Sequence, residues 1–103
     1  MKTKPANRRK EVTPDINKTW EEFSKTTFRA GALDEKTKQL IAVAVAHVTQ
    51  CPYCIRGHAP RAKRAGATEA EIMEAIWVAA EMRSGGAVAH SQLAFEAIDE
   101  AEK

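Results

Sequence analysis

Both cysteines of the chain lie in one short segment, CPYCIRGH at residues 51–58. Two cysteines three positions apart can close a disulfide or bind a metal, and a histidine four positions later can serve either chemistry. A helix would place Cys51, Cys54 and His58 on one face, about one turn apart. The unpaired N–H groups at its start would stabilise a thiolate, and His58 could accept the proton of Cys54. The segment therefore predicts a redox dithiol in which Cys51 resolves by closing a disulfide.

Two other uses of these residues remain open. A structural zinc site needs four ligands, of which this segment supplies three, so the fourth would be His47 or His90. The cysteines could instead be inert and buried, since a CxxC pair alone is a moderate signal. A c-type haem site is excluded, because that site needs histidine directly after the second cysteine and Ile55 is there.

The composition sets the class of protein. The chain has 103 residues, 44% of them hydrophobic and 29% charged, which is typical of one globular domain with a small core. A net charge of +2 is too mild to indicate nucleic-acid binding. The basic start is not followed by an apolar segment, so it is not a secretory signal, and no run reaches membrane-spanning length. We therefore expect a cytoplasmic protein with no nucleic-acid or membrane partner, in which a CxxC pair is redox-active or metal-binding.

The first half of the chain divides into an arm and two helices. Residues 1–14 carry basic residues and two prolines without apolar periodicity, which predicts a solvated arm before a single helical domain at 15–103. Apolar residues at helical spacing predict a helix from Asp15 to about Gly31. A second helix is expected at about 35–49, apolar on nearly all sides from Leu40 and therefore buried. Its alternating alanine and valine residues leave a strand as the alternative.

The second half predicts three more helices. The first starts at Cys51-Pro52 and stops at Gly66, with a kink or break at Pro60. Thr68 and Glu71 form a capping-box pattern that starts the next helix, which we expect to end at the segment SGG, residues 84–86. A final helix follows at about 87–100. The prediction is an all-α protein of about five helices with short connections, and its small core favours an oligomer.

The residues around the dithiol resemble a known family. The motif CxxCxxxH at 51–58, preceded by KTKQLIAVA at 36–44, is similar to the alkyl hydroperoxidase D and carboxymuconolactone decarboxylase family. The similarity covers about residues 30–100, including AGAT at 65–68 and GAVAH at 86–90. It implies an all-α fold whose members form homotrimers or homohexamers, with helices of neighbouring subunits packed together.

The resemblance also implies an activity. Redox members of the family are antioxidant thiol peroxidases or disulfide reductases that use no bound metal or haem. Carried over to this chain, Cys54 would attack a peroxide or disulfide substrate, His58 would accept a proton, and Cys51 would resolve the intermediate to a disulfide. A dithiol reductant that the sequence does not identify would then restore the thiols.

Two positions depart from the family pattern. Redox members usually carry glutamate twelve residues before the first cysteine, where this chain has Gln39, and an amide cannot shuttle protons. Glu35, one helical turn earlier, could replace that carboxylate or could serve only the helix dipole. Tyr53 stands between the cysteines, where some peroxidases have histidine. His90 could reach the pocket or lie at a subunit interface.

Two further classes of function stay as alternatives. One is a decarboxylase or other lactone-acting enzyme of the same superfamily, although that branch generally lacks the paired cysteines. The other is a non-catalytic module that uses the cysteines for metal binding or assembly.

Overall fold

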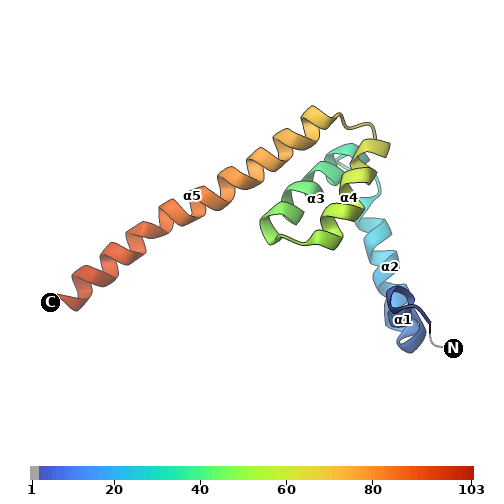
Figure 1. Cartoon of the computed structure of the whole chain (residues 1–103), viewed down its shortest axis with the longest axis horizontal. Coiled ribbons are helices and arrows are strands. Elements are labelled where there is room, and N and C mark those ends of the chain that lie inside the picture. Colours follow the sequence, from blue (N-terminus) through green and yellow to red (C-terminus); the bar gives the residue numbers. More distant parts are fainter. Residues whose placement is uncertain (1–2) are drawn as a thin grey trace. The chain divides into compact units, whose positions relative to one another are not determined.

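The computed structural model describes residues 3–103, and all of the regular structure in that range is helical. The helices are α1 (Pro5–Val12), α2 (Pro14–Phe28), α3 (Glu35–Thr49), α4 (Pro52–Arg64) and α5 (Glu69–Ala101) (Figure 1). The predicted all-α class is confirmed, and the strand alternative for the apolar run within α3 is wrong. The chain divides into two compact units, one ending at Glu35 and the other running from Lys36 to Lys103. None of the helices in the described range is both long and apolar enough to cross a membrane.

The first unit contains a helix that the sequence does not predict. Residues 3–12 of the expected arm include α1, while Met1 and Lys2 lie outside the described residues. Pro5 and Pro14 each fit the first turn of a helix, where a missing N–H leaves no bond unmade. The basic residues Arg9 and Lys10 occupy the last turn of α1, where the helix dipole favours positive charge. The arm is thus partly helical, and its separation from a single domain starting at residue 15 stays a prediction.

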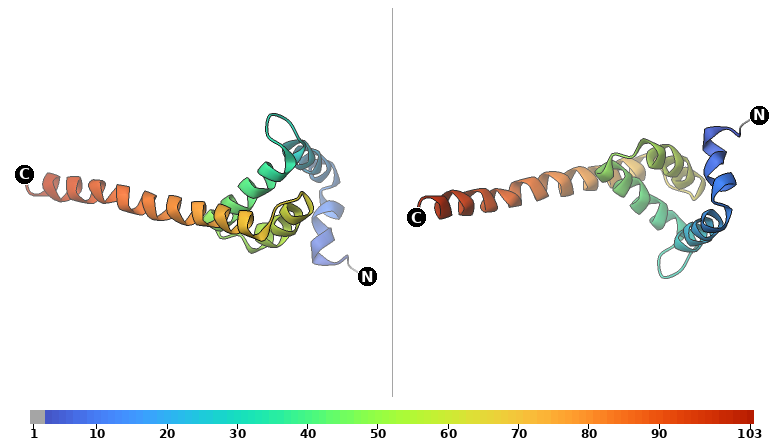
Figure 2. Two further views of the ribbon diagram at one scale, coloured as in Figure 1. Left: turned by 90° about the horizontal axis from the view of Figure 1, so that it is seen from above. Right: turned by 90° about the horizontal axis from the view of Figure 1, so that it is seen from below.

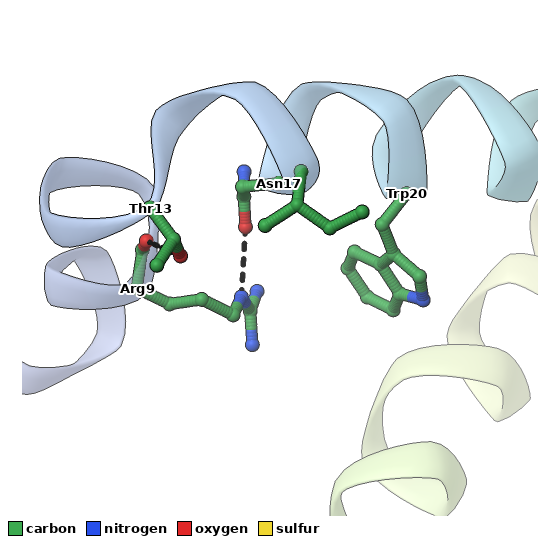
Figure 3. Close-up of a pocket in the computed structure, with 5 residues that line it drawn as sticks. Arg9, Thr13, Asn17 and Trp20 are labelled. Carbon is green, nitrogen blue, oxygen red and sulfur yellow. Dashed lines mark hydrogen bonds between the residues drawn. The ribbon is translucent and has the colours of Figure 1, made fainter.

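Arg9 joins α1 to α2 through three contacts. Its Nε donates a hydrogen bond of 2.8 Å to Oδ1 of Asn17, its guanidinium lies 4.9 Å from the centroid of the Trp20 ring, and its carbonyl accepts from the Thr13 hydroxyl (Figure 3). Asn17 is buried, and its amide nitrogen also donates to Glu21. Arg9, Thr13, Asn17 and Trp20 are among the residues that line a cavity of about 270 Å³ within the unit. The pairing of the two helices is therefore polar and aromatic, which explains why apolar periodicity does not reveal α1.

The second unit has a small core made mainly of aliphatic side chains. Val43 of α3, Ala62 of α4 and Ala67 after α4 are buried, and partly buried residues of α3, α4 and α5 pack around them. Gly66, at a φ of +102°, ends α4 as predicted, because only glycine adopts that conformation without strain. Helix α4 continues through Pro60, so the alternative of a break at that residue is wrong.

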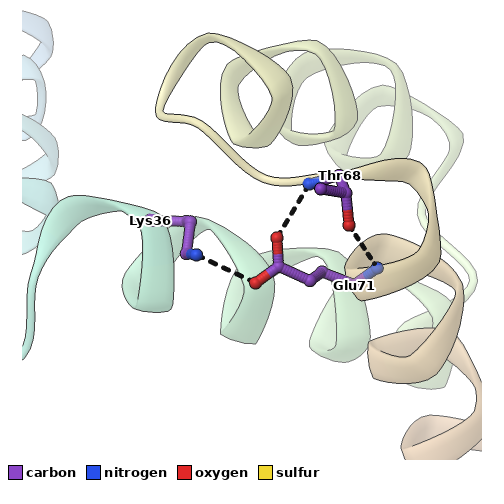
Figure 4. A network of polar contacts seen from close by, with 3 residues as sticks. All are labelled: Lys36, Thr68 and Glu71. Carbon is purple, nitrogen blue, oxygen red and sulfur yellow. Dashed lines mark hydrogen bonds and ion pairs between the residues drawn. The ribbon is translucent and has the colours of Figure 1, made fainter.

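A polar network joins the start of α3 to the start of α5. Lys36 Nζ lies 2.8 Å from Glu71 Oε2, and Oε1 of the same carboxylate accepts from the Thr68 N–H (Figure 4). The Thr68 hydroxyl in turn accepts from the Glu71 N–H, which completes the predicted capping box. Further along α5, Arg83 donates a hydrogen bond of 2.6 Å to the Val48 carbonyl near the end of α3.

Helix α5 corrects the prediction of two separate C-terminal helices. It runs for 33 residues through Gly85 and Gly86 without interruption. Each glycine costs a helix about 1 kcal/mol relative to alanine, and the alanine-rich sequence on both sides offsets that cost. Residues 3–103 contain five helices, because α1 is added to the expected set while the last two expected helices form one. The second half of α5 extends away from α3 and α4 (Figures 1 and 2).

The burial expected for the apolar helix at 35–49 is only partly correct. Gln39, Val43 and Ala46 are buried on one face of α3. Ile41, Val45 and Val48 remain exposed in the single chain, at spacings that place them along another face.

Candidate functional site

The dithiol lies where α3 turns into α4. Gln50 adopts a φ of 55°, in the left-handed region, and the Cys51 N–H donates to the Ala46 carbonyl at 3.1 Å. This pattern ends α3 and reverses the chain. Cys51 then takes the N-cap position of α4 and Pro52 its first helical position, as the sequence predicts.

Hydrogen bonding at the helix start distinguishes the two thiols. Cys51 Sγ accepts the backbone N–H of Cys54 at 3.2 Å, in the manner of a capping side chain. Hydrogen bonds from the Cys54 thiol, and then from the Cys54 N–H, lower the pKa of Cys51. Donating that thiol hydrogen bond raises the pKa of Cys54, and burial and the negative charge of Cys51 raise it further. Cys51 is half-buried and Cys54 exposed, and both are free thiols. Both effects favour negative charge on Cys51 over negative charge on Cys54.

His58 is held by the glutamine that departs from the family pattern. Its Nδ1 lies 2.8 Å from Oε1 of Gln39, which is 8% exposed. An amide oxygen only accepts hydrogen bonds, so Nδ1 carries the proton and Nε2 keeps its lone pair. Burial lowers the pKa of His58, and the positive charge of Arg61 lowers it further. At neutral pH His58 is therefore a neutral imidazole.

The other candidate residues lie apart from this pair. Glu35 is exposed at the first turn of α3, and it is Gln39 rather than Glu35 that contacts His58. His90 is exposed on the part of α5 that extends away from α4, so one chain does not bring it to the thiols. The Nδ1–H group of His47 donates a hydrogen bond of 2.7 Å to the Val43 carbonyl, which is a local contact within α3.

The zinc alternative lacks a ligand set within one chain. Among residues 3–103, no three His, Cys, Asp or Glu side chains gather in an arrangement that could hold a metal ion. A cavity of about 370 Å³ lies between α4 and α5, lined by residues that include Pro60, Lys63 and Ile76. Its lining does not include Cys51, Cys54 or His58, so the thiols do not open into it.

Three residues that shape the site were not identified from the sequence. Gln50 is one, because its left-handed backbone has no sequence signal of the kind glycine gives. Arg61 could have been found, since it follows His58 by three residues and so shares its helix face. Arg83, which contacts the end of α3 just before the turn, is distant in sequence and carries no local signal.

Several known proteins are similar to this chain in sequence and in fold. Residues 14–97 match the model of the carboxymuconolactone decarboxylase family. A Paracoccus denitrificans protein described as uncharacterized protein 4 in the cox locus is 65% identical over 78 residues, which are 76% of this chain and 70% of that protein. A crystal structure of a Methanobacterium thermoautotrophicum protein has a TM-score of 0.78 at 36% identity, covering 82% of this chain and 96% of that one.

Two more solved structures carry the family name. One, from Legionella pneumophila, has a TM-score of 0.72 at 32% identity and covers 95% of this chain and 88% of that one. The other, from Thermotoga maritima, has a TM-score of 0.63 at 32% identity, covering 85% and 94%, and a part in the antioxidative response has been suggested for it. The family match extends over most of the chain and includes α2 through most of α5. The chain belongs to the carboxymuconolactone decarboxylase family.

Proposed function

We propose that this protein is a thiol-dependent oxidoreductase whose Cys51–Cys54 pair cycles between dithiol and disulfide. The observation that carries the proposal is the hydrogen bond from the Cys54 N–H to Cys51 Sγ, which sets both sulfurs at one helix start. The suggested antioxidative role of the Thermotoga maritima relative supports the same chemistry. The substrate is a peroxide or a disulfide, and a dithiol reductant restores the thiols.

The family resemblance gives the order of steps for a peroxide. Cys54 would attack the peroxide and break its O–O bond, while His58 would accept the thiol proton and pass it to the departing oxygen, which leaves as water or an alcohol. Cys51 would then displace hydroxide from the resulting sulfenic acid. The two cysteines then share a disulfide, and the peroxide has been reduced by two electrons. The roles of Cys51, Cys54 and His58 in this order remain predictions.

The proposal includes a homo-oligomer, as a trimer or hexamer. Large apolar side chains of α5 are exposed in the single chain, among them Trp77, Met82, Val88, Leu93 and Phe95. Exposed apolar surface of this extent, together with the exposed face of α3, is typical of protein–protein contact. Packing against copies of itself would cover both helices.

Thiol titration and turnover test the activity. The reduced protein should lose two thiols per chain on exposure to hydrogen peroxide or a small disulfide, with a Cys51–Cys54 disulfide located by mass spectrometry. Steady turnover should appear when a dithiol reductant is supplied. Cys51→Ser and Cys54→Ser form a matched pair that should each lose turnover while keeping wild-type circular dichroism. Full turnover in Cys54→Ser, or no disulfide after either oxidant, would contradict the proposal.

A further inference from the structure

We propose that Arg61 is a specificity residue of this site and selects substrates that carry a negatively charged group, such as a carboxylate, close to the reacting atom. The inference rests on the proposed dithiol function. It adds to that function the charge of the substrate and the side chain that recognises this charge. It applies to a peroxide and to a disulfide alike, because the charged group takes no part in the reaction.

Arg61 lies on the face of α4 that carries Cys54 and His58. It follows His58 by three residues and Cys54 by seven, and these spacings keep the three side chains on one side of a helix. A long helical side chain covers the turn that precedes its own Cα, so Arg61 extends back toward His58. The two side chains interact: burial is the first cause that lowers the pKa of His58, and the positive charge of Arg61 is the second. The cation therefore acts on the same helix face from which the thiols react.

The charge of Arg61 is available to a substrate. The residue is exposed, and within residues 3–103 no carboxylate forms an ion pair with it. Helix α4, with the sequence PYCIRGHAPRAKR, contains three arginines and one lysine and no acidic residue. A guanidinium group presents N–H donors in a planar fork that matches the two oxygens of a carboxylate. An anionic substrate would thus find an uncompensated partner beside the dithiol.

Lys63 provides a matched comparison on the other side of the helix. It carries the same charge two residues later, so it points to nearly the opposite side of α4. There it lines the cavity next to α5, into which the thiols do not open. Arg61→Gln and Lys63→Gln change the net charge of the protein equally. Only a local effect at the dithiol can make the two variants differ.

Alkylation of the reduced protein measures the selectivity for charge directly. Iodoacetate and iodoacetamide are nearly equal in size and react with the same thiolates, but only iodoacetate is charged. The ratio of their rates is divided by the same ratio for free 2-mercaptoethanol, which removes the intrinsic reactivity of the reagents. We expect this normalised ratio to fall about threefold or more in Arg61→Gln, as Coulomb's law gives for unit charges about 7 Å apart near water.

Two further variants sharpen the alkylation result. Lys63→Gln should keep the wild-type ratio, and Arg61→Lys should keep most of it because the positive charge remains. Because Arg61 is exposed, Arg61→Gln should show the circular dichroism of the wild type. A ratio that stays unchanged in Arg61→Gln, or that falls equally in Lys63→Gln, would overturn the inference.

Salt separates the charge of Arg61 from its bulk. Raising the ionic strength from about 0.1 M to about 1 M shortens the Debye length from about 10 Å to about 3 Å. The normalised ratio of the wild type should then fall toward that of Arg61→Gln, whose own ratio should change little. A difference between the two proteins that stays the same at both salt concentrations would contradict selection by charge.

Disulfides of similar size extend the test from alkylation to oxidation of the dithiol. Dithiodipropionate is anionic, hydroxyethyl disulfide is neutral and cystamine is cationic. Their rates, each divided by the rate with free 2-mercaptoethanol, should decrease in that order for the wild type, and Arg61→Gln should narrow the range about threefold or more. Equal normalised rates for the three reagents, while a Cys51–Cys54 disulfide still forms, would overturn this inference and leave the proposed function intact. Failure to form that disulfide with any disulfide or hydroperoxide would overturn the proposed function itself. If only hydroperoxides oxidise the dithiol, the alkylation ratios decide.

Discussion

The two halves of α5 differ in how the rest of the chain holds them. The first half begins with a complete capping box, carries the ion pair from Glu71 to Lys36, buries Ala79 and ends at the Arg83 contact with α3. The second half, residues 84–101, buries none of its side chains, although several are large and apolar. A single chain thus accounts for the stability of one half only. In the proposed oligomer, the first half of α5 would therefore pack within its own subunit and the second half against another.

The largest expected effect is loss of the fold when a charged residue replaces a buried one in the first half of α5. Ala79 is 3% exposed, so Ala79→Asp would bury a carboxylate without a partner. We expect destabilisation of more than about 3 kcal/mol, measured by urea unfolding or seen as loss of cooperative thermal unfolding. Ala80→Asp, at the exposed neighbouring position, should cost less than about 1 kcal/mol. Equal stability of the two variants would show that the first half is not anchored as described.

A charged residue introduced into the second half of α5 should instead weaken the association of subunits. Phe95 is 65% exposed in the single chain, so Phe95→Asp should leave each subunit helical. If this residue is buried between subunits, the loss is about 2 kcal/mol or more, equal to association weakened about 30-fold. Analytical ultracentrifugation over a dilution series would measure the shift toward smaller species. Gln92→Asp adds the same charge at an exposed polar position one turn earlier and should assemble nearly as the wild type does. Unchanged association of Phe95→Asp would remove the second half from the interface.

This contrast also explains what the sequence could predict. The capping box at Thr68 and Glu71, the proline after Cys51 and the glycine at 66 are local signals, and each marks a real helix boundary. The pair Gly85-Gly86 is also a local signal, yet it marks no boundary. Helix propensity costs of about 1 kcal/mol at each glycine are small beside the cooperative continuation of a long helix. A local signal therefore marks a boundary only where the surrounding sequence does not favour continuing the helix.

The candidate site also combines features that the sequence predicts with features that only the structure supplies. The spacing of Cys51, Cys54 and His58 and the alignment of Gln39 with the position of a family glutamate could be read from residues alone. The direct contact between Gln39 and His58 is a long-range one across two helices, and the structure supplies it. Which sulfur receives the Cys54 N–H depends on Cys51 lying at the cap and on the left-handed Gln50 before it. Residue types could not predict that geometry.

A smaller effect is expected from acidification of the first half of α5. The hydrogen bond from Lys36, then the Thr68 N–H, lowers the pKa of Glu71. Because the folded pKa lies below the unfolded value, this carboxylate contributes stability at neutral pH and loses it as pH falls through the acid range. The Tm of the wild type should therefore fall more between about pH 5 and pH 3 than that of Glu71→Gln.

Glu74→Gln is the control for this pH dependence. Glu74 is exposed on the same helix, so its loss removes one acid without removing the contact to Lys36. The Tm of this variant should follow the wild-type pH dependence. If the Tm of Glu71→Gln fell with pH as steeply as that of the wild type, the link between α3 and α5 would not stabilise the fold.

The smallest expected effects come from single methyl groups at two helical glycines. A Cβ built at Gly57 in α4 or at Gly86 in α5 meets no atom within 4 Å in the single chain, and neither glycine has a positive φ. Alanine at either position should therefore stabilise its helix by about 0.5–1 kcal/mol, measured by chemical unfolding. The two substitutions should differ in their effect on association between subunits. Gly57→Ala should leave association unchanged, and Gly86→Ala should do so only if no backbone of another subunit approaches α5 there. Gly86→Ala could instead weaken association while it stabilises the isolated subunit. That result would place the closest approach of the partner helix at this glycine. It would also explain why glycine is present where the helix itself would be more stable with alanine.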